Sequence, residues 1–222
     1  TVSSAGLVAA VANGTATITA TSTWTSGVAS KTATVTVSQV VSSVTLSPTT
    51  LSFASFADTA TLTLTVKDVN DSTIVSPTVT LVSSDTTVAT ISSAGLVASK
   101  GNGTATITAT SGSVSATAAV TVAQVAAAVA LSDSTLSFAS LADTTQLTAT
   151  VTDANGETLS GATVTWVSSD TTKATVSTAG LVTSVADGTA TITVTSGSAS
   201  ATASVTVAQV AAAVALSDST LS

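Results

Sequence analysis

VSSAGLVAAVANGTATITATS, at residues 2–22, returns as ISSAGLVASKGNGTATITATS at 91–111 and as VSTAGLVTSVADGTATITVTS at 176–196. A segment that returns at long, regular intervals identifies a repeat protein, and it sets the frame in which every other motif is interpreted. The chain is therefore built from copies of one unit.

The spacing between copies is almost constant. The glycine before Leu-Val stands at positions 6, 95 and 180, so that the first interval is 89 and the second is 85. The Val-Thr-Val run before a glutamine begins at 35, 120 and 205, where both intervals are 85. The four extra residues of the first interval therefore lie in the stretch 21–31 around Trp24, where the sequence predicts a loop insertion.

The opening of the unit also recurs, as LSPTTLSFAS from Leu46, LSDSTLSFAS from Leu131 and a shortened LSDSTLS from Leu216. These phases predict a C-terminal half-repeat at 1–42, a first complete repeat at 43–127, a second at 128–212, and the first strand of another at 213–222. A period of this length exceeds the roughly 20 to 50 residues of solenoid units and suits an independent β domain. Since the sequence has neither an initial methionine nor a signal segment, we expect it to be part of a longer protein.

Within each repeat the residues alternate as they do in half-buried strands. In the stretch 103–110, Ala105, Ile107 and Ala109 share one face, while threonines occupy the other. The apolar residues from Val114 to Val122 alternate in the same way. About seven such short segments per repeat, separated by Gly, Asn, Asp and Ser turns, predict an antiparallel two-sheet sandwich. The predicted fold class is all-β, with tandem Ig-like sandwiches.

The alanine-rich run AQVAAAVAL at 123–131 joins the two complete repeats. Propensity alone allows a helix there, but the run is short and begins without a capping residue, so we expect extended chain. It contains neither glycine nor proline. Without a flexible composition, this junction predicts a fixed relation between neighbouring repeats.

Composition excludes several classes of function. The chain of 222 residues has no histidine, cysteine, methionine or tyrosine, so it lacks the imidazole base and the thiol nucleophile, and we expect no enzyme. Its net charge of −7 disfavours nucleic acid as a partner. No stretch approaches the roughly 20 apolar residues that span a bilayer, so no membrane insertion is expected in this segment.

The succession TLSFAS at 50–55, TLTLTVKD at 61–68, VTLVSSDTTVATISSAGLVASKGNGTATITATS at 79–111 and VSATAAVTV at 114–122 resembles the bacterial immunoglobulin-like group 2 domains. Such domains recur in surface adhesins of the intimin and invasin type, in S-layer-associated proteins and in phage virions. The resemblance implies an Ig-like sandwich, an extracellular cell-surface location, and a role in spacing or adhesion. Trp166 stands where that family often carries a core tryptophan.

Two turns gather oxygen ligands of the kind that Ca²⁺ prefers. Their members are Asp68, Asn70 and Asp71 in the first repeat, and Asp153, Asn155 and Glu157 in the second. Neither has the six to eight oxygens of a dedicated calcium loop, so a turn closed by Asx side chains on local backbone is the favoured interpretation. Calcium is the one candidate cofactor.

Trp24 is the large aromatic residue of the insertion, and it is a candidate contact for a partner or a neighbouring repeat. Packing on its own domain is the alternative. The sequence predicts a stalk or spacer, or the building unit of a surface filament or layer, which associates with itself or with neighbouring repeats. The alternatives are an adhesin module that binds a glycan or host receptor through its end loops, and a phage virion decoration domain.

Overall fold

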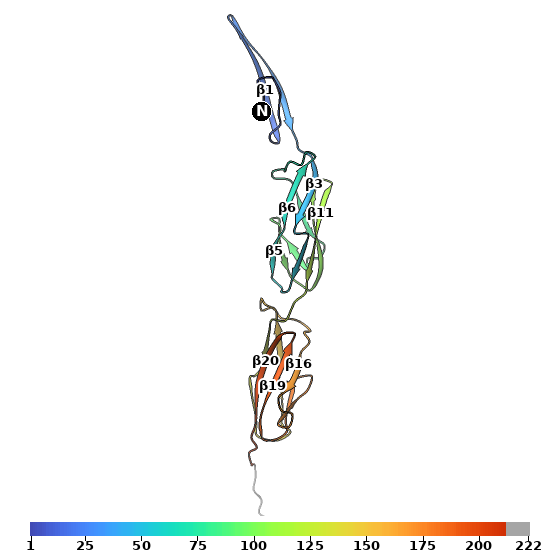
Figure 1. Cartoon of the computed structure of the whole chain (residues 1–222), viewed down its shortest axis with the longest axis vertical. Coiled ribbons are helices and arrows are strands. Elements are labelled where there is room, and N and C mark those ends of the chain that lie inside the picture. The colour runs from blue at the N-terminus through green and yellow to red at the C-terminus, as the bar shows by residue number, and fades with distance from the viewer. Residues whose placement is uncertain (212–222) are drawn as a thin grey trace, which may run out of the picture.

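The computed structural model describes residues 1–211, in which three β-rich units follow one another along one long axis (Figure 1). The described residues contain strands and no helix, which confirms the all-β prediction. No helix in this part of the chain is therefore long and apolar enough to cross a membrane. The strand predicted at 213–222 lies outside the described residues.

The first repeat is a two-layer sandwich. One layer is a four-stranded sheet in the order β4-β11-β10-β7, and the other consists of the pair β3-β6 and the sheet β5-β9-β8. Its strands are β3 (Val41–Ser47), β4 (Thr50–Phe53), β5 (Thr59–Thr61), β6 (Thr63–Asp68), β7 (Thr80–Ser83), β8 (Ala89–Ile91), β9 (Leu96–Ser99), β10 (Gly103–Ser111) and β11 (Val114–Val122).

The second repeat has the same arrangement. Its sheets are β13-β20-β19-β16, β12-β15 and β14-β18-β17. Its strands are β12 (Ala128–Leu131), β13 (Thr135–Phe138), β14 (Thr144–Gln146), β15 (Ala149–Thr152), β16 (Thr165–Ser168), β17 (Ala174–Val176), β18 (Leu181–Ser184), β19 (Gly188–Ser196) and β20 (Ala199–Val207).

Each repeat has nine strands where about seven were predicted, because two stretches, 41–53 and 59–68 in the first repeat, each form two short strands. The first changes sheets: β3 pairs antiparallel with β6, whereas β4 pairs parallel with β11. The second is interrupted between β5 and β6 at the buried Leu62. The N–H of Leu62 donates to the carbonyl of Gly95. Hydrophobic alternation does not reveal a change of partner, so the sequence could not show either break.

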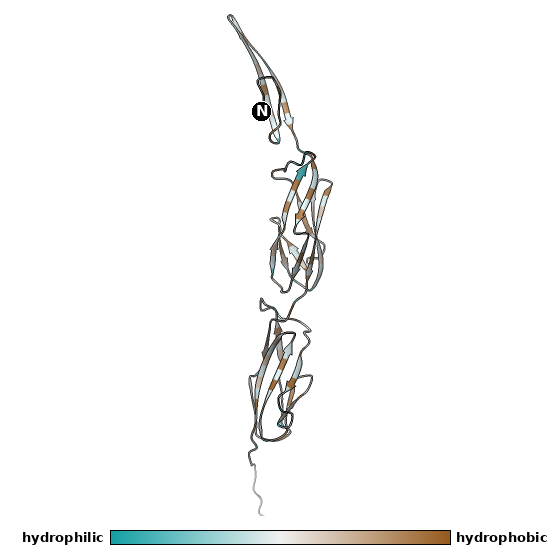
Figure 2. Cartoon of the chain, in the orientation of Figure 1, coloured by the Kyte–Doolittle hydropathy of each residue, from teal (hydrophilic) through white to brown (hydrophobic). Residues whose placement is uncertain are grey.

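The predicted core faces are confirmed. Ala105, Ile107 and Ala109 are buried on the inner face of β10, while the neighbouring threonines point outward. Ile192 occupies the same place in the second repeat and is fully buried. Trp166 is partly buried against this second core. Figure 2 shows the resulting bands of apolar and polar residues along the strands.

The half-repeat contributes one long hairpin, β1 (Gly14–Trp24) and β2 (Gly27–Val37). Each of its strands has 11 residues, whereas β10 and β11 have 9. The predicted loop insertion is therefore wrong, since the four extra residues lengthen both strands by two and leave a two-residue turn. Adding residues in cross-strand pairs keeps the antiparallel ladder intact.

The junction at residues 123–127 is extended and not helical, as expected, but it is not a continuous strand. Ala123 N–H donates to the Phe53 carbonyl (3.0 Å), and Ala127 N–H donates across to the Thr152 carbonyl of the second repeat (2.8 Å). Because its N–H groups donate to two different repeats, the segment is not part of one continuous β-ladder. It is nevertheless bonded to both neighbours.

Candidate functional site at the junction between repeats

Asp153 directly follows β15, at the end of the second repeat that faces the first, and it is only 2% exposed. Its Oδ1 accepts the N–H of Asn155 (3.0 Å) and of Glu157 (2.9 Å), which closes a local Asx turn. Asp68 closes the equivalent turn of the first repeat on the N–H groups of Asn70 (2.9 Å) and Ser72 (3.0 Å).

The other carboxylate oxygen of Asp153 joins two repeats. Oδ2 accepts the backbone N–H of Phe56 (2.8 Å) and the side-chain Nε2 of Gln124 (2.9 Å), both from the first repeat. Asn155 Nδ2 donates in the reverse direction, to the Phe56 carbonyl (2.7 Å) and to Asp58 Oδ1 (2.9 Å). We call these five residues the clasp.

Asn102 orients the glutamine of the clasp. Its Oδ1 accepts the Gln124 N–H (2.7 Å), and its Nδ2 donates to Gln124 Oε1 (3.3 Å). With Oε1 so occupied, Gln124 directs its Nε2 donors toward Asp153. Gly103, the next residue, has a positive φ of 140° in the turn before β10, but the asparagine acts through its side chain.

Sequence reasoning missed the glutamine. Gln39, Gln124 and Gln209 each follow the Val-Thr-Val run of their own copy, and this regular recurrence was the available signal. A polar residue held at a fixed place beside a repeat junction is a candidate for contact with the next repeat.

Hydrogen bonding controls the ionisation of the clasp carboxylate. Burial raises the pKa of Asp153, but the N–H donors of Gln124, Phe56, Glu157 and Asn155 stabilise the ionised form more strongly and hold the pKa below its ordinary value. The pKa of Asp68 is also lowered, chiefly by the Gln39 side chain. Both carboxylates are therefore ionised at neutral pH.

The junction between the half-repeat and the first repeat is an incomplete version of the clasp. Gln39 Nε2 donates to Asp68 Oδ2 (2.8 Å), but no described residue takes the place of Phe56 or Asp58. A cavity of about 670 Å³ lies there instead, lined in part by Val40, Val69 and Asn70.

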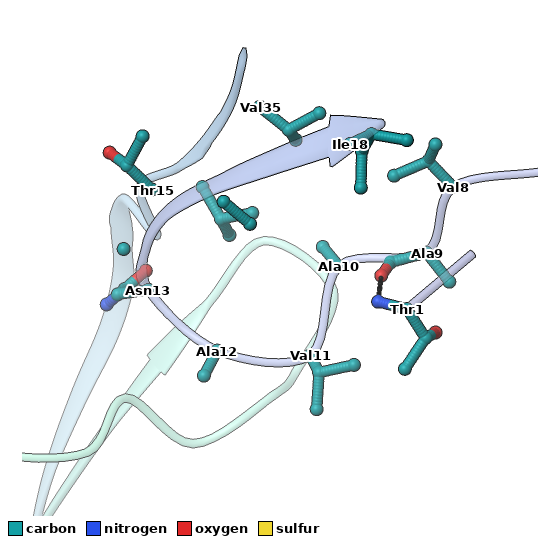
Figure 3. Close-up of a pocket in the computed structure, with 13 residues that line it drawn as sticks. Thr1, Val8, Ala9, Ala10, Val11, Ala12, Asn13, Thr15, Ile18 and Val35 are labelled. Atoms are coloured by element: carbon teal, nitrogen blue, oxygen red, sulfur yellow. Dashed lines mark hydrogen bonds between the residues drawn. The ribbon is translucent and has the colours of Figure 1, made fainter. Parts of the chain in front are cut away.

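A second cavity, of about 230 Å³, lies along the half-repeat hairpin (Figure 3). Ile18 and Val35 line it, and their counterparts Ile107 and Val120 are buried in the first repeat. The cavity is thus the core face of a sandwich that lacks its opposite layer in this chain, and it has no charged lining side chain that would bind a polar ligand.

The predicted calcium ligands of the two turns lie in different surroundings. Asp71 is exposed and pairs with Lys67 (2.9 Å), and Glu157 is exposed. Among residues 1–211, no three acidic side chains cluster as a metal site would require. The oxygens of Asp153 already accept four N–H groups, so a cation there would compete with these donors. Calcium binding at these turns stays a prediction.

Trp24 ends β1 at the tip of the long hairpin, where it is 53% exposed and its ring lies against Gly27. Its predicted contact with a partner or a neighbouring repeat stays a prediction.

Comparison with known proteins identifies one family. The model of the bacterial Ig-like domain (group 2) matches residues 40–122 and again 126–207. No curated protein sequence is matched.

Solved structures of similar fold include surface layer protein SbsC, domains 1-6, at 22% identity and a TM-score of 0.39, covering 94% of this chain and 37% of that one. SbsC domains 4 and 5 are 25% identical, with a TM-score of 0.36 and coverage of 76% and 98%. The Yersinia pseudotuberculosis adhesin InvE is 16% identical, with a TM-score of 0.34 and coverage of 75% and 60%. The chain spans little more than a third of the longer SbsC structure.

Proposed function

We propose that this chain, which belongs to the bacterial Ig-like domain (group 2) family, is a spacer segment of an extracellular cell-surface protein. Membership of that family supports a surface structural or adhesive role. The clasp is the observation that carries the narrower proposal, because it holds successive sandwiches in line. No enzymatic activity is part of the proposal.

A spacer must resist bending between its units. A covalent linker alone leaves two domains free to swing, and relative domain motion is the default unless the interface opposes it. Here the Asp153 carboxylate and the Asn155 amide bond to the backbone of Phe56, which is itself fixed in the first repeat. Hydrogen bonds to a charged group are about twice as strong as neutral ones, so these contacts favour one orientation.

The length of such a spacer grows with the number of its repeats. The nine residues of β11 span about 30 Å at the usual rise per residue, so each in-line repeat adds at least that length. A row of such repeats extends a terminal module from a surface without any ligand-binding pocket of its own.

The test measures the distance distribution between the two complete repeats. The chain has no cysteine, so Thr117→Cys and Thr202→Cys supply single spin labels on the outer faces of β11 and β20. Combining Gln124→Ala with Asn155→Ala removes the side-chain donors of the clasp. The distance distribution measured by double electron–electron resonance should then become broader. Equal widths with and without these changes would reject the spacer proposal.

The chain offers a matched control. Gln209→Ala with Asn70→Ala removes the same residue types from equivalent positions outside this junction, and it should leave the distribution unchanged. Broadening in both chains would indicate a general loss of structure and not a loss of the clasp.

A building unit of a filament or layer is a second candidate, favoured by the outer faces of the four-stranded sheets. These faces present Thr, Ser and Ala without a charged residue, together with Val82 and Val167, which are 54% and 57% exposed. Sedimentation should then show association that rises with concentration and is lost in a Val82→Lys, Val167→Lys chain, because edge lysines oppose strand-to-strand contact. A monomer at every concentration would contradict it. The adhesin and virion interpretations stay predictions.

A further inference from the structure

The far end of the second repeat is built like the end of the first repeat that carries the clasp. Leu141, Asp143 and Gln209 occupy the positions that Phe56, Asp58 and Gln124 hold one repeat earlier. We call Leu141, Asp143 and Gln209 the distal surface. No described residue accepts a hydrogen bond from the Leu141 N–H, and Leu141 is 41% exposed.

The distal surface has the conformation of its docked counterpart although nothing described is docked on it. Ala142 has a positive φ of 61°, where Ala57 has 59°. Ala142 N–H donates to the Ser184 carbonyl (3.0 Å), as Ala57 N–H does to the Ser99 carbonyl (3.1 Å). The loop is therefore shaped by its own repeat, and docking would require little reordering.

The chain that leaves the second repeat follows the same path as the linker between the two repeats. Val210 N–H donates to the Ala139 carbonyl (3.0 Å), as Val125 N–H does to the Ala54 carbonyl (2.9 Å). Residues 213–222 also repeat 128–137 residue for residue. The continuity of this path and this sequence with the existing junction indicates which occupant the surface fits.

We propose that the distal surface docks the Asp-x-Asn turn of a further repeat of the same type, joined in the same chain. One carboxylate oxygen of that turn accepts the Leu141 N–H and Gln209 Nε2, and the carboxamide two residues later donates to the Leu141 carbonyl and to Asp143. This inference rests on the proposed spacer function and identifies the partner that extends it.

One sequence difference makes docking at the distal surface weaker than docking at the equivalent surface of the first repeat. Asp187 stands where the first repeat has Asn102, and its Oδ1 accepts the Gln209 N–H (2.9 Å). A carboxylate has no donor for the Gln209 side-chain oxygen, so it competes for the Nε2 donors that the incoming aspartate needs. It also brings a like charge toward that aspartate.

The test compares amide exchange at Leu141 and Phe56. A chain lengthened after Ser222 by a second copy of residues 138–211 gains a complete further repeat without foreign sequence, because Ser222 corresponds to Ser137. Leu141 should exchange at least about tenfold more slowly in the longer chain, as expected for one hydrogen bond to a charged group. Asp→Ala at the added copy of Asp153 should restore fast exchange.

Phe56 serves as the internal reference. It should be protected in both chains, and slow exchange at the added copy of Ile192 shows that the added repeat is folded. Fast exchange at Leu141 beside a folded added repeat overturns the inference and leaves the spacer proposal intact. Fast exchange at Phe56 in the present chain overturns the clasp itself.

Asp187→Asn in the longer chain should slow exchange at Leu141 further, because it restores the donor that Asn102 provides. An unchanged rate would overturn the role given to Asp187.

Discussion

The half-repeat and the first complete repeat contain the same hairpin in two different surroundings. Both pair in the same register, Gly14 with Val37 and Gly103 with Val122. Ile107 is fully buried, whereas its counterpart Ile18 lines an open cavity. Strand pairing is thus set by the hairpin itself, and burial is set by the layer that packs against it.

The same contrast holds at the two junctions. The first repeat gives the second a backbone N–H, a carbonyl and two side chains, whereas the half-repeat gives the first only Gln39. The turn that receives these contacts is closed in the same way in both repeats. The receiving turns are therefore alike, and the contacts differ because residues 1–42 include no counterpart of Phe56 or Asp58.

The largest expected difference comes from the paired core substitutions Ile107→Ala and Ile18→Ala. Removing a buried isoleucine side chain costs about 2–5 kcal/mol through lost burial and the cavity left behind. Its counterpart Ile18 is only partly buried, so its truncation should lower the free energy of unfolding by clearly less. Amide exchange in β10 of the Ile107→Ala chain and in β1 of the Ile18→Ala chain measures the two losses of stability. Similar losses would mean that the half-repeat has a packed core of its own.

A smaller effect is expected at the junctions, from Asp153→Ala and Asp68→Ala. The first removes the acceptor of the Phe56 N–H, so exchange of that amide should accelerate at least about tenfold. The second removes only contacts of the half-repeat junction and its own turn, and Phe56 exchange should not change. Acceleration by both variants would show that the two junctions are coupled.

The next largest effect is expected at low pH, which should weaken the clasp. Because folding lowers the pKa of Asp153, the unfolded state takes up the proton first as the pH falls. The stability that the ionised carboxylate provides is therefore full above about pH 5, and it is lost below about pH 4 as the pH passes through the folded pKa. Urea midpoints of the native and Asp153→Asn chains should converge over that range. A constant gap would show that Asp153 does not titrate with unfolding.

Calcium should have the smallest effect. Each oxygen of Asp153 already accepts two N–H groups, and a cation would compete with them, so the favoured turn interpretation predicts the same melting temperature with Ca²⁺ and with chelator. Asp71→Asn is the control for non-specific charge effects. A higher melting temperature in Ca²⁺, lost in Asp153→Asn, would establish a cation site.

Part of the candidate site was visible in the sequence. Asp153 and Asn155 were identified as one turn, because Asx residues two apart favour that local geometry. Their bonds to Phe56 were not, since the partners are 97 and 99 residues distant along the chain. The regular spacing of Gln124 was the one signal in the sequence for its role, and nothing in the sequence indicated that Asn102 orients it.

The repeat, the strand pattern and the inward face of each strand could all be predicted from the amino-acid sequence, because period-two alternation and turn residues act between near neighbours. The partner that each strand pairs with, and the contact of Asp153 with the preceding repeat, were known only from the folded chain. Both depend on residues far apart in the sequence, because β4 pairs with β11 and Asp153 accepts the N–H of Phe56, and alternation between near neighbours carries no information on such partners.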